Sequence, residues 1–203
     1  MTVKLSRRAA APSSQRGKHE RRTLALREET LRLAVVADTH SRAHERSCEL
    51  IAAERPDYIL HAGDIGSLDV LDELGKLAPV LAIRGNIDTQ AAGLADFMTI
   101  SITKAEQTLV TLLLLHIGVY GAKLRADAAR LARQQGAALV ICGHSHIPFI
   151  GRDAGIAIFN PGSMGPRRFQ LPIVFGVMEL EGGRIRMHHV DCETGRVWRP
   201  PGA

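Results

Sequence analysis

The sequence predicts an α/β fold in which two β-sheets pack together and helices lie outside. Residues 32–37 and 58–62 are almost continuously apolar, as strands buried on both faces of a sheet are. A helical segment at about 43–54 separates these two strands, and another at about 67–76 leads to a third strand at 80–84. This βαβαβ order favours a parallel sheet with right-handed crossovers.

The second half of the chain consists mostly of short strands, which predict the second sheet. The β-rich runs 98–103 and 108–115 are separated by a short linker and are most simply a hairpin. A helix is expected at about 122–135, followed by a strand at 138–142. The remaining strands are expected at 147–150, 156–159, 172–180 and 184–191, the last two joined by a Gly-Gly turn.

Residues 1–30 differ in composition from the rest, and we expect them to form a basic, disordered N-terminal extension to a single domain of residues 31–203. They hold eight Lys or Arg against three Glu, which leaves 18 basic and 18 acidic residues in the remainder. The net charge of +5 therefore belongs to the extension. Because phosphate tracking needs clustered cations, the balanced domain makes nucleic acid an unexpected partner.

The cysteines and the hydropathy indicate the compartment. Three cysteines, an odd count without Cys-x-x-Cys spacing, argue against a disulfide framework or a thiolate metal site and favour a reducing environment. No apolar stretch approaches the roughly 20 residues of a membrane span. We therefore expect a cytoplasmic protein that does not bind membranes.

Five predicted strands deliver an Asp, Asn or His to their carboxyl ends, three of them through a glycine. In open α/β sheets this edge is where binding sites are built. The donors are oxygen and nitrogen atoms, without sulfur, as Mn, Fe, Co, Ni or Zn accept. The candidate ligands are Asp38, His40, Asp64, Asn86, His116, His144 and His146.

Seven ligands are more than one ion needs, and they divide into two sites if the Asp64 carboxylate bridges two ions. Two ions about 3.5–4 Å apart lower the pKa of a bridging water, and the resulting hydroxide can attack a phosphoester. Such a reaction needs no protein nucleophile, and the sequence contains no Gly-x-Ser-x-Gly motif.

These motifs, in order and spacing, resemble those of the calcineurin-like metallophosphoesterases over about residues 31–191. Two further segments resemble the small prokaryotic phosphodiesterases of the YfcE type: Gly85-Asn86-Ile87-Asp88 and Asn160-Pro161-Gly162-Ser163. The resemblance implies a four-layer αββα sandwich, two divalent ions with manganese foremost, and self-association into homo-oligomers. It assigns one ion to Asp38, His40, Asp64 and His146, and the other to Asp64, Asn86, His116 and His144.

We therefore expect a metal-dependent phosphodiesterase that acts on small phosphodiester or nucleotide-like substrates, with Asp64, Asn86 and His144 as catalytic residues. Larger relatives carry a histidine where this chain has Ile87, so we expect slow turnover that favours good leaving groups. Two alternatives stay open: a non-catalytic protein-binding scaffold on the same fold, as in the retromer subunit, and a nucleotide-processing phosphatase or nuclease. The complete ligand set favours the enzyme.

Other polar residues carry more than one interpretation. Asp88 is expected either to orient a ligand histidine or to cap the following helix. His61 is expected in the core, and His189 on the surface. Arg84 fits a phosphate contact or an ordinary salt bridge equally well, and Arg168 is expected in a solvated turn.

Overall fold

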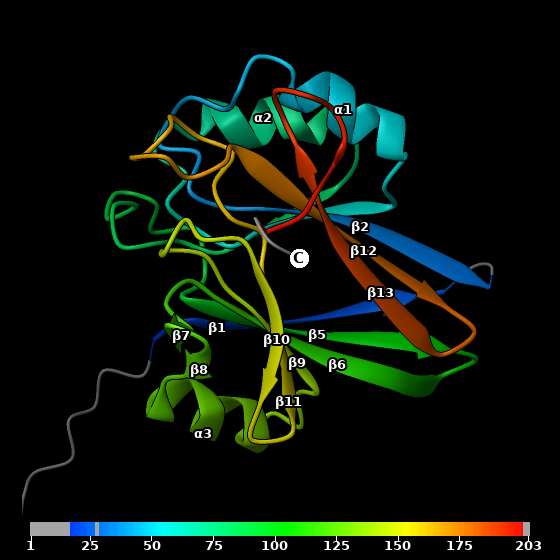
Figure 1. Ribbon diagram of the computed structural model, residues 1–203. Helices are drawn as coiled ribbons and strands as arrows, with labels where there is room; N and C mark the ends of the chain where they lie inside the picture. Colours follow the sequence, from blue (N-terminus) through cyan, green and yellow to red (C-terminus); the bar gives the residue numbers. More distant parts are fainter. Residues whose placement is uncertain (1–16, 27–28, 201–203) are drawn as a thin grey trace, which may run out of the picture.

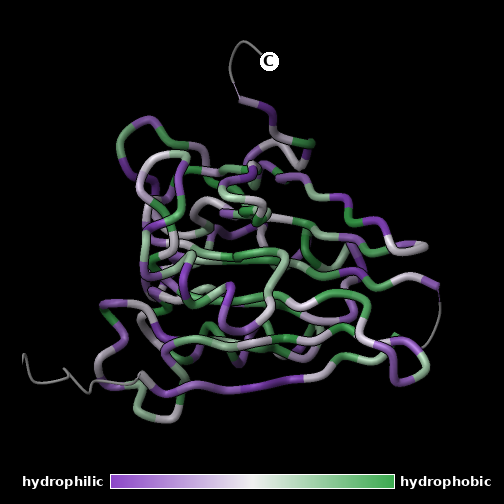
Figure 2. The backbone as a smooth tube through the Cα atoms, turned by 90° about the horizontal axis from the view of Figure 1, so that it is seen from below, coloured by the Kyte–Doolittle hydropathy of each residue, from purple (hydrophilic) through white to green (hydrophobic). Residues whose placement is uncertain are grey.

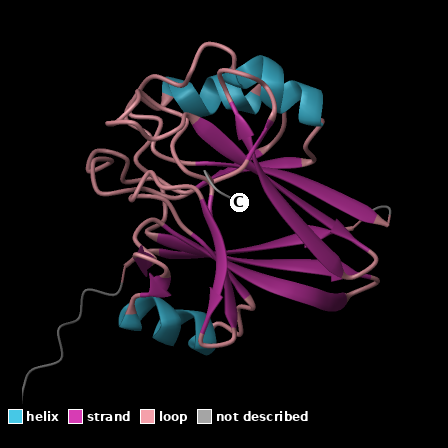
Figure 3. Ribbon diagram, in the orientation of Figure 1, coloured by secondary structure: helices cyan, strands magenta, loops and turns pink. Residues whose placement is uncertain are grey.

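The structure is a computed structural model that describes residues 17–26 and 29–200 of the 203-residue chain. Two six-stranded sheets lie face to face between α1 (Ser47–Glu54) and α2 (Asp69–Gly75) on one side and α3 (Ala126–Gln134) on the other (Figures 1 and 3). The predicted four-layer αββα architecture is therefore confirmed.

The first sheet contains the predicted parallel unit. Strand β2 pairs in parallel with β3, and β3 with β4, while β12 joins the other side of β2 in antiparallel orientation. Its spatial order is β14 (Val197–Trp198), β13 (Arg184–Asp191), β12 (Val174–Glu181), β2 (Thr30–Val36), β3 (Tyr58–His61) and β4 (Val80–Ala82).

The second sheet also has a parallel centre, in which β6 pairs with β9 and β9 with β11. A separate two-stranded ribbon, β7 (Val119–Tyr120) with β8 (Lys123–Leu124), precedes α3. The spatial order of the second sheet is β1 (His19–Ala25), β5 (Phe97–Lys104), β6 (Gln107–Leu115), β9 (Leu139–Ile141), β11 (Ile156–Asn160) and β10 (Phe149–Asp153).

The apolar run of β2 is explained by burial on both faces. Alternate residues Leu33 and Val35 point into the core between the sheets, whereas Ala34 and Val36 pack in the cluster that includes Ile51 of α1. A third cluster holds α3 against the outer face of the second sheet. The hydrophobic strand segments accordingly lie between the more polar loops in Figure 2.

Both predicted hairpins are confirmed. Strands β5 and β6 are joined through Ala105 and Glu106, which both have positive φ angles of 46° and 66°. Gly182 and Gly183 join β12 to β13 with φ angles of 53° and 78°. Two consecutive left-handed residues form the turn whose twist matches that of the strands.

The expected boundary at residue 31 is wrong, because residues 19–25 form β1 and pair in parallel with β5 at the edge of the second sheet. Leu24 is 4% exposed and belongs to the core. Its neighbours Arg21, Arg22 and Thr23 are exposed, so this edge strand lacks the apolar alternation by which strands are recognised. The rest of the predicted extension, residues 1–16, lies outside the described residues.

The short strands β7, β8 and β14 were not predicted, because two residues are too few for a periodic pattern. Among the described residues, no helix is long and apolar enough to cross a membrane.

Candidate metal centre

The seven predicted ligands lie on loops that follow the carboxyl ends of β2, β3, β4, β6 and β9. Three of these strands belong to the first sheet and two to the second, and their loops gather at one side of the molecule (Figure 3). The two sheets meet there directly, because the backbone N–H of His144 donates to Asp38 Oδ2 at 2.9 Å.

Five of the seven residues have left-handed backbone conformations, with φ between 47° and 69°. Each such residue costs of order 1–2 kcal/mol relative to the ordinary conformation, and unfavourable backbone of this kind concentrates at functional sites. These residues are Asp38, His40, Asp64, His144 and His146.

One group of ligand atoms comes from Asp38, His40 and His146, and all lie within 4.8 Å of one another. His146 Nε2 lies 3.2 Å from His40 Nε2 and 3.5 Å from Asp38 Oδ1. His146 Nδ1 is buried without a hydrogen-bond partner among the described residues. The group therefore brings together electron-pair donors, one of which, His146 Nδ1, the described residues leave without a partner.

A second group consists of Asp64, His116 and His144, again within 4.8 Å. Asn86 completes it, since its Oδ1 lies 3.1 Å from His116 Nε2 and 2.9 Å from His144 Nδ1. Asp64 lies between the groups: Oδ1 is 3.1 Å from His116 Nε2, and Oδ2 is 4.0 Å from His40 Nε2.

The donor chemistry of the second group fits a cation. His116 Nδ1 lies 2.8 Å from the Ala62 carbonyl oxygen, which can only accept, so this nitrogen carries the proton. In the neutral ring Nε2 then has a lone pair, which faces Asn86 Oδ1 and Asp64 Oδ1 at 3.1 Å. Three acceptor atoms that face one another without a donor are an arrangement that a metal ion stabilises.

The two carboxylates differ in protonation. Burial raises the pKa of Asp38 to about 7, and the charge of Asp64 acts in the same direction. Burial also acts to raise the pKa of Asp64, but the hydrogen bond and charge of His116 outweigh it and hold this pKa at about 2. Two carboxylates so close together lose both protons most readily when cations lie between them.

Most of the histidines are held neutral. Burial lowers the pKa of His40, His144 and His146, in the last case to about 4. For His116 burial acts in the same direction, but the hydrogen bond that the protonated ring donates to Asp64 and the charge of Asp38 reverse this effect and raise the pKa. Neutral imidazole is the form that binds metals, so three of the four rings are ready as ligands at neutral pH.

Two glycines permit the close approach of these loops. A Cβ at Gly85 would lie 2.1 Å from Asp64 Oδ1, and one at Gly143 would lie 2.9 Å from Asp38 Oδ2. Both distances are shorter than van der Waals contact, so any side chain there would displace a carboxylate of the centre.

Asp88 supports the centre in a way that neither sequence interpretation described. Its carboxylate accepts the backbone N–H groups of Ile65 and Gly66 at 3.0 and 2.9 Å and that of Gly85 at 2.7 Å. It thus ties together the loops that carry Asp64 and Asn86, and within the described part of the chain its carboxylate bonds to backbone N–H groups and to no histidine.

The Asn160–Ser163 segment lies behind the first group. Asn160 Nδ2 donates to the Gly143 carbonyl at 2.9 Å and to Ser145 Oγ at 3.0 Å, while Ser163 Oγ donates to the Asp38 carbonyl at 2.9 Å. These bonds hold the His144 and Asp38 loops at fixed positions from beneath.

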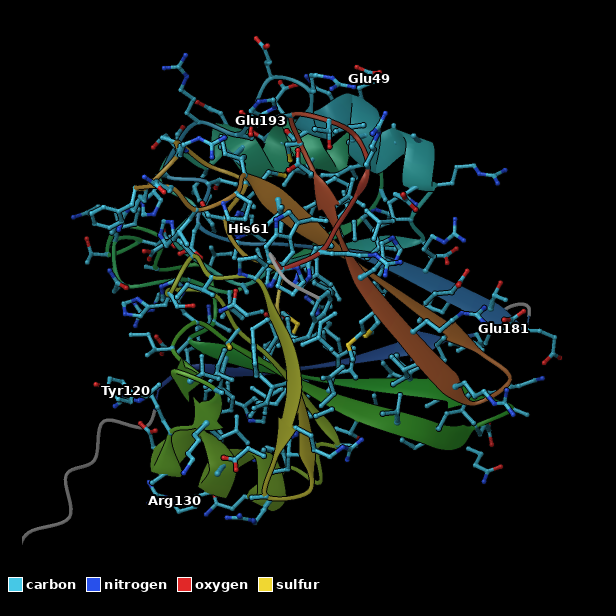
Figure 4. The ribbon with its side chains drawn as sticks, viewed as in Figure 1. Glu49, His61, Tyr120, Arg130, Glu181 and Glu193 are labelled. Atoms are coloured by element: carbon cyan, nitrogen blue, oxygen red, sulfur yellow. The ribbon has the colours of Figure 1, made fainter. Side chains whose placement is uncertain are left out.

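The structure also places four other polar residues for which the sequence allowed an expectation. His61 is fully buried, as expected, and Figure 4 shows it inside the molecule. Arg84 forms a salt bridge of 2.5 Å with Asp96. His189 is buried, not exposed: its Nε2 donates to the Asn160 carbonyl oxygen at 2.8 Å. Arg168 is exposed as expected, but its Nη2 lies 3.3 Å from His40 Nε2.

A pocket of about 260 Å³ adjoins the second group, with Asn86 and His116 in its wall. Ile117, which follows His116, is partly exposed there. The pocket offers mainly apolar surface beside the candidate ligands, and its apolar lining consists of Phe97, Leu115, Ile117 and Leu131.

Comparisons with known proteins identify the family. The model of the calcineurin-like phosphoesterase superfamily domain matches residues 31–183. A probable metallophosphoesterase of Methanothermobacter thermautotrophicus is 33% identical over 171 residues, which cover 83% of this chain and 94% of the relative. The chain thus belongs to the calcineurin-like phosphoesterase superfamily, a family of metal-dependent phosphoesterases, as its motifs predicted.

Solved structures show the same fold at low sequence identity. Vacuolar Protein Sorting 29 of Cryptosporidium parvum has a TM-score of 0.68 at 16% identity, covering 84% of this chain and 96% of its own. A structure described as a novel archaeal phosphodiesterase has a TM-score of 0.60 at 20% identity, covering 79% of this chain and 100% of its own.

The burial of His61 makes the stability of the fold depend on pH. Its Nδ1 accepts from the Gly63 N–H at 3.2 Å, and its Nε2 donates to Thr39 Oγ1 at 3.1 Å. Only the neutral ring can accept at Nδ1. Burial lowers its pKa in the folded chain to about 3, against 6.5 when unfolded. Its contribution is fully present above pH 6.5 and is lost as the pH falls toward 3, at up to about 1.4 kcal/mol per pH unit.

Urea denaturation of metal-free wild-type and His61→Asn protein between pH 7 and pH 4 measures this effect. Other shifted groups, such as Asp38, titrate in both proteins, so the difference in unfolding free energy reports His61. The advantage of the wild type should shrink as the pH falls. Parallel curves over this range would contradict the role of a buried neutral imidazole.

Proposed function

We propose that this protein is a phosphodiesterase that uses two divalent ions. The observation that carries the proposal is the position of Asp64, whose two carboxylate oxygens are directed toward different ligand groups. A carboxylate shared in this way divides the candidate ligands into two sites. The left-handed backbone and the neutral imidazoles of the same residues support the assignment.

Asp38, His40 and His146 would hold one ion, and Asn86, His116 and His144 the other, with Asp64 common to both. When bound, two such ions supply a hydroxide nucleophile at neutral pH and stabilise the charge on the phosphoryl oxygens. Oxygen and nitrogen donors without sulfur suit Mn, and also Fe, Co, Ni or Zn.

The chain's own residues contribute the orientation of the candidate ligands. Asn86 Oδ1 lies 2.9 Å from His144 Nδ1 and so fixes the orientation of this ring, whose side chain is exposed to solvent and to substrate. His144 would act in catalysis as the exposed ligand of the second group, where it would help to hold the ion that stabilises the phosphoryl oxygens. Asp88 and Asn160 hold the loops so that these side chains need little rearrangement on substrate binding.

The second candidate function is a protein-binding scaffold, because Vacuolar Protein Sorting 29 is among the proteins of similar fold. The complete set of seven ligands favours hydrolysis, since a scaffold has no need of strained backbone and buried carboxylates in one cluster. A nuclease is disfavoured by the balance of 18 basic and 18 acidic residues over positions 31–203.

Hydrolysis of bis-p-nitrophenyl phosphate in the presence of Mn²⁺ tests the proposal. The wild-type protein should release p-nitrophenol, and Asp64→Ala and His144→Ala should each lower kcat/KM by about three orders of magnitude, because the charge stabilisation that is lost is worth several kcal/mol.

Two matched variants serve as controls for this experiment. Asp72→Ala removes an exposed carboxylate of α2, and His188→Ala removes an imidazole of β13; both positions lie outside the centre. Both controls should retain wild-type activity. Equal activity of Asp64→Ala and Asp72→Ala, or no hydrolysis by the metal-loaded wild type, would refute the proposal.

The leaving group should limit the rate, because Ile87 and Ile117 follow two of the ligands and neither can donate a proton. A positioned general acid contributes about 100-fold or more. The ratio of kcat/KM for p-nitrophenyl over alkyl phosphodiesters should therefore exceed about 100. Ile87→His should narrow this ratio and Ile87→Gln should not. Equal rates for aryl and alkyl diesters in the wild type would contradict this account.

A further inference from the structure

Arg168 lies on a loop that is clamped to the first ligand group. Gly165 packs so closely that a Cβ there would lie 2.4 Å from the Asp38 carbonyl oxygen, and the Met164 backbone N–H donates to the Ala37 carbonyl at 3.2 Å. The Met164 carbonyl in turn accepts the His44 N–H at 2.8 Å. The base of the loop is thus fixed to both sides of the Asp38–His40 turn, and Arg168 follows three residues later.

The guanidinium of Arg168 faces the centre. Its Nη2 lies 3.3 Å from His40 Nε2, an atom of the first ligand group. After burial, the charge of Arg168 is the largest influence that lowers the pKa values of His40 and His146. Arg168 therefore acts electrostatically on the centre, although its side chain is exposed.

The adjacent arginine is held differently. The Arg167 guanidinium pairs with Glu193 and donates to the Leu171 carbonyl at 2.8 Å. Arg168 has no carboxylate within ion-pair distance among the residues that the structure describes. Of two neighbouring arginines on one loop, one is neutralised at the surface and the other carries an unpaired charge beside the centre.

The backbone around Arg168 is strained without a compensating burial. Phe169 has a φ of 52°, and its side chain is 93% exposed. The Leu171 N–H donates to the Arg168 carbonyl at 3.1 Å and closes this turn. An unfavourable conformation at a bulky residue that packs against nothing is the kind of strain that marks a functional position.

We propose that Arg168 is a positioning residue that binds a non-bridging oxygen of the substrate phosphate, opposite the metal ligands. A cation next to a cation site is unfavourable unless an anion lies between them, and the planar guanidinium suits phosphate oxygens. Because Nη2 and His40 Nε2 are only 3.3 Å apart, the exposed Arg168 side chain would rotate outward to admit the phosphate between itself and the Asp38–His40–His146 group. This inference rests on the proposed function, because it assigns one contact of the same substrate.

Binding of inorganic phosphate to the Mn²⁺-loaded protein, measured by calorimetry, tests the inference independently of turnover. Arg168→Gln should raise the dissociation constant about tenfold or more, which is the effect of one charge-assisted hydrogen bond. The dissociation constant of Arg168→Lys should lie between those of the wild type and Arg168→Gln, since lysine keeps the charge but lacks the planar guanidinium. Arg167→Gln, the matched control, should bind phosphate as the wild type does.

Two further readouts separate positioning from a structural role. With bis-p-nitrophenyl phosphate, Arg168→Gln should raise KM more than it lowers kcat. The affinity for Mn²⁺ should stay equal or increase, because a neighbouring positive charge is removed. A variant with a damaged centre would instead lose Mn²⁺ affinity.

The outcomes distinguish this inference from the proposed function. Wild-type phosphate affinity in Arg168→Gln, or no phosphate binding by the metal-loaded wild type, would overturn the role of Arg168. If phosphate binding depends on Arg168 while no diester is hydrolysed, the inference stands and the proposed function fails. If hydrolysis occurs and the Arg168 and Arg167 variants behave alike, the inference alone fails.

Discussion

The centre depends on one contact between the two sheets, in which Asp38 at the end of β2 accepts the backbone N–H of His144 at the end of β9. This bond brings together the carboxyl ends of two separate sets of parallel strands. Gly143 makes the contact feasible, because a side chain there would collide with the same carboxylate. The remaining ligands follow from this arrangement, since each lies on the loop after a strand of one of the two sets.

This construction stores unfavourable free energy at the centre. Five left-handed residues, a buried Asp38 with a raised pKa and several acceptor atoms within 4.8 Å all oppose folding in the absence of a cation. The fold offsets these costs with the large core between the sheets and with backbone bonds to Asp88 and Asn160. Metal binding would use the same atoms, so it should be coupled to the stability of the loops.

The sequence was sufficient to predict the centre of the fold because burial on both faces gives a continuous apolar strand, as in β2 and β3. Apolar strands also locate the loops of the candidate site, since β3 and β6 are each followed by a potential metal ligand, Asp64 and His116. The consecutive glycines Gly182 and Gly183 likewise predicted a hairpin, because glycine readily adopts the positive φ that such a turn needs. These features depend on residues close together in the sequence.

Features that arise from distant contacts could not be predicted. The exposed residues of β1 hide from the sequence its pairing with β5, which the parallel register of the two strands shows in the structure. His189 is buried, with a hydrogen bond to the Asn160 carbonyl and an edge-to-face contact with Trp198. Arg168 lies beside His40, from which it is 128 positions away in the sequence. Asp88 binds backbone atoms from two other loops. None of these contacts leaves a periodic pattern in the sequence. For Arg168 the short distance in sequence from the Asn160–Ser163 segment was an indication that it lies near the site.

The central claim is that the seven side chains hold two ions that share Asp64. Anomalous diffraction from crystals of the protein grown with Mn²⁺ tests it most directly, because it locates each ion among its ligands. The account predicts two anomalous peaks per chain, one beside Asp38, His40 and His146 and one beside Asn86, His116 and His144, with Asp64 in contact with both. A single peak, or no peak at these residues, would contradict it.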